Sequence, residues 1–262
     1  MSNSSPATVM AKRLLDSQSY WKTDAGRALW DVQRACLGPV IENRAGRHGL
    51  EMGMGPSLMN VSAIAHPIRW APALGVATGP STLVCPPDHL ALPDRCMNVV
   101  IIHHWLEHLD APHHALQEAA RVTADDGRLV LMGFNPLGLN ALTRKLRKRS
   151  SEFPYNGQWH KPSRLRDWLA FVDFEVERVD YCCFRGLMKA TCRESWEALG
   201  RRNNLPWGES YMIQAQRRQQ SAPIKRVRFS LPTPLPSSSL GATRSTSAHV
   251  YPPDTAGRPR TR

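Results

Sequence analysis

The sequence predicts an α/β protein with a parallel sheet, from three consecutive segments. Residues 99–102 are a short apolar run bounded by turn residues, which is typical of a strand buried on both faces. Residues 111–122 have a helical pattern, with Pro112 in the first turn, where proline is tolerated. Residues 128–133 form a second apolar strand after a turn at Asp125-Asp126-Gly127. Strand, helix and strand in this order form a βαβ unit, so the sheet is at least partly parallel.

Helical and strand-like spacings of apolar residues also predict the other elements. Residues 11–45 carry a helical apolar face that Gly26 and Gly38-Pro39 interrupt, so we expect two short helices there. Residues 174–181 alternate with period two, as in a half-buried strand. We expect further strands near residues 50–52, 68–70, 83–85 and 211–216, and helices at residues 57–65, 162–171 and 195–200.

Length and charge divide the chain into three parts. At 262 residues it can hold one sizeable α/β domain with extensions. We expect a helical extension at residues 1–45, the α/β domain at residues 46–217, and a disordered tail rich in Pro, Ser and Arg at residues 218–262. The net charge is +12, but residues 217–262 hold nine Lys/Arg and one acid, Asp254. The basic balance therefore belongs mostly to the tail and is weak support for nucleic-acid binding.

The cysteines and the hydropathy pattern predict a cytoplasmic protein. Six cysteines are scattered without a Cys-x-x-Cys pair, which favours reduced thiols over a disulfide framework. The first residues lack an apolar core, so no secretory signal is expected. No run of about 18 apolar residues occurs, so no membrane partner is expected either.

Five motifs occur in a fixed order between residues 50 and 132. The first is a glycine loop after a strand, which lets backbone N–H groups approach a ligand that a Cβ atom would exclude. The motifs are Leu50-Glu51-Met52-Gly53-Met54-Gly55, Asp88 four residues before Leu92, Asn98-Val99-Val100-Ile101-Ile102, Trp105-Leu106-Glu107-His108-Leu109 with Pro112, and Arg121-Val122 followed by Asp126-Gly127-Arg128-Leu129-Val130. Together they resemble the class I S-adenosylmethionine-dependent methyltransferases, specifically the UbiE-like (methyltransferase type 11) domain.

That resemblance implies a fold, a cofactor and an activity. The fold is Rossmann-like: a mostly parallel seven-stranded sheet with helices on both faces. The activity is in-line transfer of a methyl group to a small or anionic acceptor, which asks mainly for positioning and desolvation. The implied cofactor is S-adenosyl-L-methionine, with Glu51, Gly53, Gly55, Asp88 and His103 as its binding residues. His103 and His104 lie at the mouth of that site and are candidates to orient or deprotonate an acceptor.

Two departures from the family pattern keep an alternative open. Ser57 stands at the third glycine position, and residues 68–72 carry no carboxylate to grip the ribose hydroxyls. A hydrogen bond to a charged group is worth roughly 1.5–3 kcal/mol, so this loss would weaken cofactor binding. The alternative is a catalytically inactive binding module. It would contact nucleic acid or another acidic partner through the basic run at residues 144–149 and the tail.

Five histidines between residues 103 and 114 raise the question of a metal. His104 and His108 are four apart and could share one helix face. The pattern is not His-Glu-x-x-His, and no thiolate or carboxylate pair completes a ligand set, so no metal is expected. Phe134-Asn135-Pro136 follows the fifth strand instead of forming the Asn-Pro-Pro-aromatic motif of amino-group methyltransferases, which argues against nucleobase N-methylation.

Overall fold

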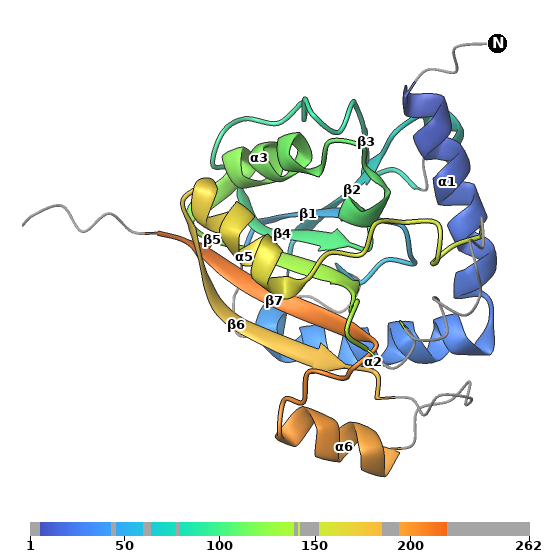
Figure 1. The fold of residues 1–262 in the computed structure, drawn as a ribbon. Coiled ribbons are helices and arrows are strands. Elements are labelled where there is room, and N and C mark those ends of the chain that lie inside the picture. The colour runs from blue at the N-terminus through green and yellow to red at the C-terminus, as the bar shows by residue number, and fades with distance from the viewer. Residues whose placement is uncertain are drawn as a thin grey trace, which may run out of the picture. The chain divides into compact units, whose positions relative to one another are not determined.

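A seven-stranded sheet forms the centre of the protein (Figure 1). The computed structural model describes residues 6–42, 46–59, 64–76, 79–138, 141, 152–184 and 194–218. The strands are β1 (His48–Gly53), β2 (His66–Ala71), β3 (Thr82–Val84), β4 (Met97–His103), β5 (Thr123–Phe134), β6 (Phe174–Cys182) and β7 (Ser210–Arg217). Their order is β3-β2-β1-β4-β5-β7-β6, and β7 alone runs antiparallel to its neighbours. This confirms the predicted mostly parallel sheet.

Helices cover both faces of the sheet because its central strands are apolar on both sides. In β4, Val100 and Ile102 belong to the core under α3 (Pro112–Val122) and α5 (Pro162–Phe171). Val99 and Ile101 belong to a second core, under α2 (Asp24–Glu42). Fully burying each such side chain contributes about 1.5–3 kcal/mol. The alternation along one strand therefore fixes its register between two helical layers.

The first helix, α1 (Pro6–Trp21), crosses the carboxyl edge of the parallel strands (Figure 1). Ser17 Oγ lies 2.6 Å from the Met54 carbonyl oxygen, just after β1. The Arg13 guanidinium donates to the carbonyl of His108, after β4. Two short 3₁₀ segments, η2 (Leu74–Val76) and η3 (Leu106–His108), and the helix α6 (Glu194–Arg202) complete the described elements.

The two N-terminal helices are present but longer than predicted, because neither glycine nor proline ends them where expected. Gly26 lies in the first turn of α2, where a Cβ atom would come within 2.2 Å of the Tyr20 carbonyl oxygen. The glycine thus permits a sharp corner between α1 and α2. Pro39 lies inside the C-terminal part of α2, where it removes a single backbone donor.

The predicted turn at Asp125-Asp126-Gly127 is wrong, because β5 already begins at Thr123. Thr123 pairs with Met97 and Arg128 pairs with Val99, so the intervening residues form a bulge opposite Asn98. Of the helix predicted at residues 57–65, Ser57 and Leu58 are not helical, and residues 60–63 lie outside the described residues. The basic run at residues 144–149 and the tail from residue 219 also lie outside them.

Candidate functional site

A buried chain of hydrogen bonds joins α2 to the ends of β4 and β7. Gln33 of α2 places its Oε1 2.9 Å from His103 Nε2 and its Nε2 2.8 Å from His104 Nε2. The same Nε2 lies 2.6 Å from Ser210 Oγ, at the start of β7. All four side chains are buried, and both histidines have no exposed surface. One amide therefore holds both histidines at the end of β4.

The network assigns the tautomer of each histidine. Ser210 donates its hydroxyl hydrogen to the carbonyl of Gly133 and so accepts from Gln33 Nε2. This orients the amide, with Oε1 toward His103, whose Nε2 must carry a hydrogen. Since Gln33 Nε2 donates to His104 Nε2, the hydrogen of His104 is on Nδ1, which lies 3.3 Å from Glu107 Oε2.

Both histidines are neutral at physiological pH. Burial lowers the pKa of His104 to about 3. Burial also lowers the pKa of His103 well below its ordinary value, and the nearby His104 and Arg69 lower it further. His103 Nδ1 therefore carries a lone pair that can accept a hydrogen bond but binds a proton weakly.

The glycine loop after β1 packs against His103. A Cβ atom on Gly55 would lie 2.6 Å from His103 Cε1 and 3.1 Å from Trp21 Cε2. A Cβ atom on Gly53 would lie 3.1 Å from the Cβ of His103. His103 Nδ1 would be 2.9 Å from the Gly55 Cβ position, and it has no hydrogen-bond partner among the described residues. A buried, unpaired acceptor thus faces the glycine loop.

Glu51 lies at the core side of this loop and is 2% exposed. Its carboxylate accepts from the backbone N–H of Leu58 at 2.9 Å and of Met59 at 3.4 Å. Ser57, at the third glycine position of the motif, donates its hydroxyl to the same carboxylate at 2.6 Å. Ser57, which replaces the third glycine of the motif, therefore helps to bind the loop to Glu51.

Two cavities lie along α1 at this edge of the sheet. The smaller, about 230 Å³, is bounded by α1, the loop at Met54, Gly55 and Pro56, and the end of β2. The larger, about 810 Å³, is lined by Asp88, Pro72 and Cys85 and by Arg13 and His108. The structure thus brings His103 together with Gly53 and Gly55 and places Asp88 at the larger cavity.

The end of β2 differs in charge from the pattern that the resemblance implies. Arg69, with no carboxylate nearby in β2, lines the smaller cavity and donates from Nη2 to the carbonyl of Gly55 at 2.5 Å. A guanidinium therefore anchors the glycine loop from the β2 side. A ligand that binds there meets a cation where the family places an anion.

Sequence reasoning missed Gln33, although the sequence contains a signal for it. Gln33 lies four residues after Leu29 and four before Leu37, on the apolar stripe of α2 that also holds Cys36. A polar residue on a buried stripe needs partners. Its partners lie 70 or more positions away in the chain, so the pattern alone does not identify them.

Two other features considered from the sequence, a metal site and a membrane-spanning helix, are absent from the described residues. No group of three or more His, Cys, Asp or Glu side chains within them is arranged to hold a metal ion. None of the helices that the structure describes is long and apolar enough to span a membrane.

The sequence is similar to a known protein family and to a protein of Escherichia coli. Residues 52–131 match the family described as "Methyltransferase domain". The chain is 36% identical over 145 residues to the uncharacterized protein YafS of Escherichia coli (strain K12), a match that spans 53% of this chain and 58% of YafS. The chain thus spans less than two thirds of the length of that relative.

Solved structures show the same fold. A SAM-dependent methyltransferase of Thermotoga maritima superposes with a TM-score of 0.63 at 19% identity, over 80% of this chain and 99% of that one. A SAM-dependent methyltransferase of Archaeoglobus fulgidus gives a TM-score of 0.52 at 18% identity, over 72% and 94%. The fold is therefore that of the class I methyltransferases. Residues 52–131 thus resemble a methyltransferase domain, and the described residues have the fold of that class.

Proposed function

We propose that the protein is an S-adenosylmethionine-dependent methyltransferase that acts on a small or anionic acceptor. The observation that carries the proposal is the unpaired Nδ1 of His103, which is buried and faces Gly53 and Gly55. An unpaired buried acceptor is costly, and a cationic ligand group at the glycine loop would satisfy it. The α-ammonium of the cofactor is such a group. When bound, the cofactor supplies a methyl group already activated on a sulfonium.

The other site residues have distinct roles in this proposal. Gly53 and Gly55 leave the loop backbone open to the cofactor, and Asp88 accepts from the adenine amino group at the larger cavity. Glu51 acts indirectly, because its carboxylate is engaged by Ser57, Leu58 and Met59. With no carboxylate in β2 to hold the ribose, the affinity rests on the two ends of the cofactor.

The histidines act by position rather than by proton transfer. Both nitrogens of His104 are hydrogen-bonded, so His104 holds Gln33 and Glu107 in place. His103 is neutral and, with its lowered pKa, is a hydrogen-bond acceptor rather than a general base. Catalysis then rests on orientation of the acceptor and exclusion of water.

The larger cavity has room for a small acceptor beside the adenine end of the cofactor. Its volume of about 810 Å³ lies in the range of small-molecule sites. It is lined by two apolar residues of α1, Val9 and Met10. The guanidinium of Arg13 and the imidazoles of His108 and His114 lie beside them. We also propose a cytoplasmic location, because the scattered cysteines favour reduced thiols.

Calorimetry with S-adenosylhomocysteine tests the proposal. We expect micromolar binding by the wild-type protein. Asp88→Ala should weaken it roughly 10-fold or more through the lost charged hydrogen bond, and Gly55→Val should abolish it because the loop has no room for a side chain. Asp126→Ala, an exposed acid away from both cavities, is the matched control and should bind normally. No heat and no thermal shift with the wild-type protein would refute the proposal.

A further inference from the structure

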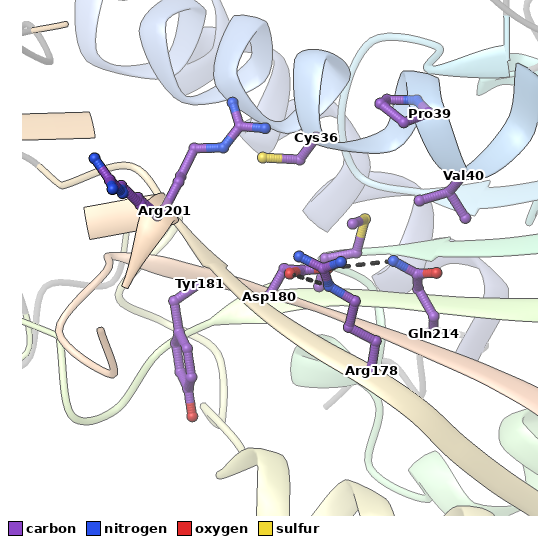
Figure 2. Close-up of a pocket in the computed structure, with 10 residues that line it drawn as sticks. Cys36, Pro39, Val40, Arg178, Asp180, Tyr181, Arg201 and Gln214 are labelled. Carbon is purple, nitrogen blue, oxygen red and sulfur yellow. Dashed lines mark hydrogen bonds and ion pairs between the residues drawn. The ribbon is translucent and has the colours of Figure 1, made fainter. Parts of the chain in front are cut away.

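A separate cavity lies between α2, the β6–β7 edge of the sheet and α6 (Figure 2). Its volume is about 300 Å³. Figure 2 shows Cys36 on α2 and Arg201 on α6 projecting into it, with Arg178 and Asp180 of β6 on its floor. None of these residues belongs to the site proposed for methyl transfer.

Two thiols are neighbours here, and one of them, Cys36, lines the cavity. Cys36 is hydrogen-bonded to Cys182, the last residue of β6, and both lie in the core cluster under α2. Cys36 lines the cavity and is 7% exposed, whereas Cys182 is 1% exposed and does not line it. A small reagent that enters the cavity therefore reaches Cys36 first.

The surroundings favour the thiolate form of Cys36. The hydrogen bond from the Cys182 thiol lowers the pKa of Cys36, and the positive charge of Arg201 acts in the same direction. Burial, Glu197 and Asp180 oppose these effects without reversing them. As the donor in the hydrogen bond to Cys36, and because it is buried, Cys182 has a raised pKa and stays protonated.

The positive charge of Arg201 is not paired with a carboxylate among the described residues. The Asp180 carboxylate is engaged by Arg178 Nε at 2.6 Å and by Gln214 Nε2 at 3.2 Å. Arg201 has no ion pair with any residue that the structure describes, and it lies at the exposed mouth of the cavity. Its charge is thus directed at whatever occupies the cavity, including an oxygen that gains negative charge.

We propose that Cys36 and Cys182 form an oxidant-reactive pair, with Cys36 as the attacking thiol, Cys182 as the resolving thiol and hydrogen peroxide as the oxidant. The Cys36 thiolate attacks one peroxide oxygen and the O–O bond breaks. This gives a sulfenic acid on Cys36, and the released hydroxide takes a proton to become water. The Cys182 thiol then attacks the Cys36 sulfur, an S–S bond forms and a second water leaves. Two thiols are oxidised and one peroxide is reduced, so the step balances.

The pair also lies beside the methyl-transfer site. Cys182 is paired across the sheet with Ser210, and Ser210 accepts the hydrogen bond of Gln33. Cys36 lies one helical turn after Gln33 on α2. A disulfide would therefore tie α2 to β6 next to the residue that holds His103 and His104.

Treatment of the full-length protein with hydrogen peroxide tests the pair. We expect titration of the six cysteines to lose two thiols, and peptide mass spectrometry to find a Cys36–Cys182 disulfide that dithiothreitol reverses. Cys182→Ser should leave a sulfenic acid on Cys36 that dimedone traps, and Cys36→Ser should leave Cys182 reduced. Cys85→Ser, which removes another buried thiol, is the matched control and should still form the disulfide.

A surface variant keeps the test valid if a cysteine variant fails to fold. Arg201→Gln changes an exposed side chain and should slow oxidation of Cys36 roughly twofold at low salt, because the thiolate fraction falls with the lost charge. The half-buried Cys96, whose pKa is raised by burial, should react later than Cys36. Oxidation of Cys96 before Cys36, or two lost thiols without the Cys36–Cys182 link, would overturn the proposal.

Discussion

Gln33 is the residue on which the buried polar site depends. Its amide pairs with His103, His104 and Ser210 at 2.6–2.9 Å. Its amide accepts from His103 through the oxygen and donates to His104 and Ser210 through the nitrogen. The unpaired Nδ1 of His103 is thus a consequence of Gln33, which fixes the hydrogen on Nε2.

Replacement of Gln33 measures the cost of the network. Gln33→Leu is similar in size but leaves the buried Nε2 atoms of His103 and His104 unpaired, each costing about 1–3 kcal/mol, while Ser210 keeps its bond to the Gly133 carbonyl. We expect the free energy of unfolding, measured in urea, to fall by about 3 kcal/mol or more. Gln117→Leu on the exposed side of α3 is the matched control and should change it by less than about 0.5 kcal/mol. Equal effects of the two substitutions would contradict the burial argument.

The individual site residues were only partly predictable. The glycine motif predicts that Gly53 and Gly55 let the backbone approach a ligand, whereas the structure places the side chain of His103 against both glycines. Local pattern gave no reason for Arg69 to anchor the loop, because its partner, the carbonyl of Gly55, is selected by the packing of β2 beside β1. Side-chain contacts of this kind depend on tertiary register, which sequence periodicity does not specify.

At the scale of elements, the strands were more predictable than their ends. The segment that forms β4 contains a continuous apolar run, Val99 to Ile102, and lies at the centre of the sheet. The start of β5 was missed because an Asp-Asp-Gly sequence, which normally marks a turn, forms a bulge here. The corner between α1 and α2 was misplaced because Gly26 serves close packing against Tyr20 rather than ending a helix.

Arg121 joins α3 to the loop that precedes β4. Its guanidinium donates to the carbonyls of Leu90 and Leu92 at 3.0 Å and pairs with Glu118 at 2.8 Å. The hydrogen bond from Arg121 lowers the pKa of Glu118. This connection positions the segment between β3 and β4, which includes Asp88.

Removal of this guanidinium should loosen that segment. Arg121→Met keeps the aliphatic stem but removes the Arg121 donor from the Leu92 carbonyl and leaves the Leu90 carbonyl with only the Leu92 N–H. We therefore expect the free energy of unfolding to fall by about 2 kcal/mol, allowing for partial exposure. Arg27→Met, which breaks an exposed pair with Asp24, is the control and should cost less than about 1 kcal/mol. Hydrogen exchange should rise at residues 88–95 in Arg121→Met. Unchanged exchange there would show that the loop is held by other contacts.

At the scale of the whole molecule, the fold concentrates neutral histidines at one edge. His103, His104 and His108 end β4 or follow it, under α1. Burial lowers the pKa of His108 to about 4, as it lowers that of His104 to about 3 and that of His103 well below its ordinary value. Stability should therefore depend on pH through this one edge.

The sign follows from proton binding in the two states. An unfolded histidine titrates near pH 6.5, so below that pH the unfolded chain binds protons that the folded chain excludes. The stabilisation is fully present above about pH 6.5 and is lost as the pH falls toward 4 for His108 and toward 3 for His104. Between pH 6 and pH 5, the free energy of unfolding should fall by about 1 kcal/mol for each histidine, or about 3 kcal/mol for the three.

Urea unfolding at pH 7, 6 and 5 measures this dependence. His108→Phe preserves a ring that stacks on Phe153 and removes one titrating group. Between pH 6 and 5, the free energy of unfolding of this variant should therefore fall by about 1 kcal/mol less than that of the wild type. His89→Gln, an exposed position, should leave the profile unchanged. A wild-type stability that is flat from pH 7 to 5 would mean that the edge opens and hydrates its histidines in the folded state. The tautomers that Gln33 assigns, and with them the hydrogen-bond acceptor that we propose for the cofactor, would then hold only when the edge is closed.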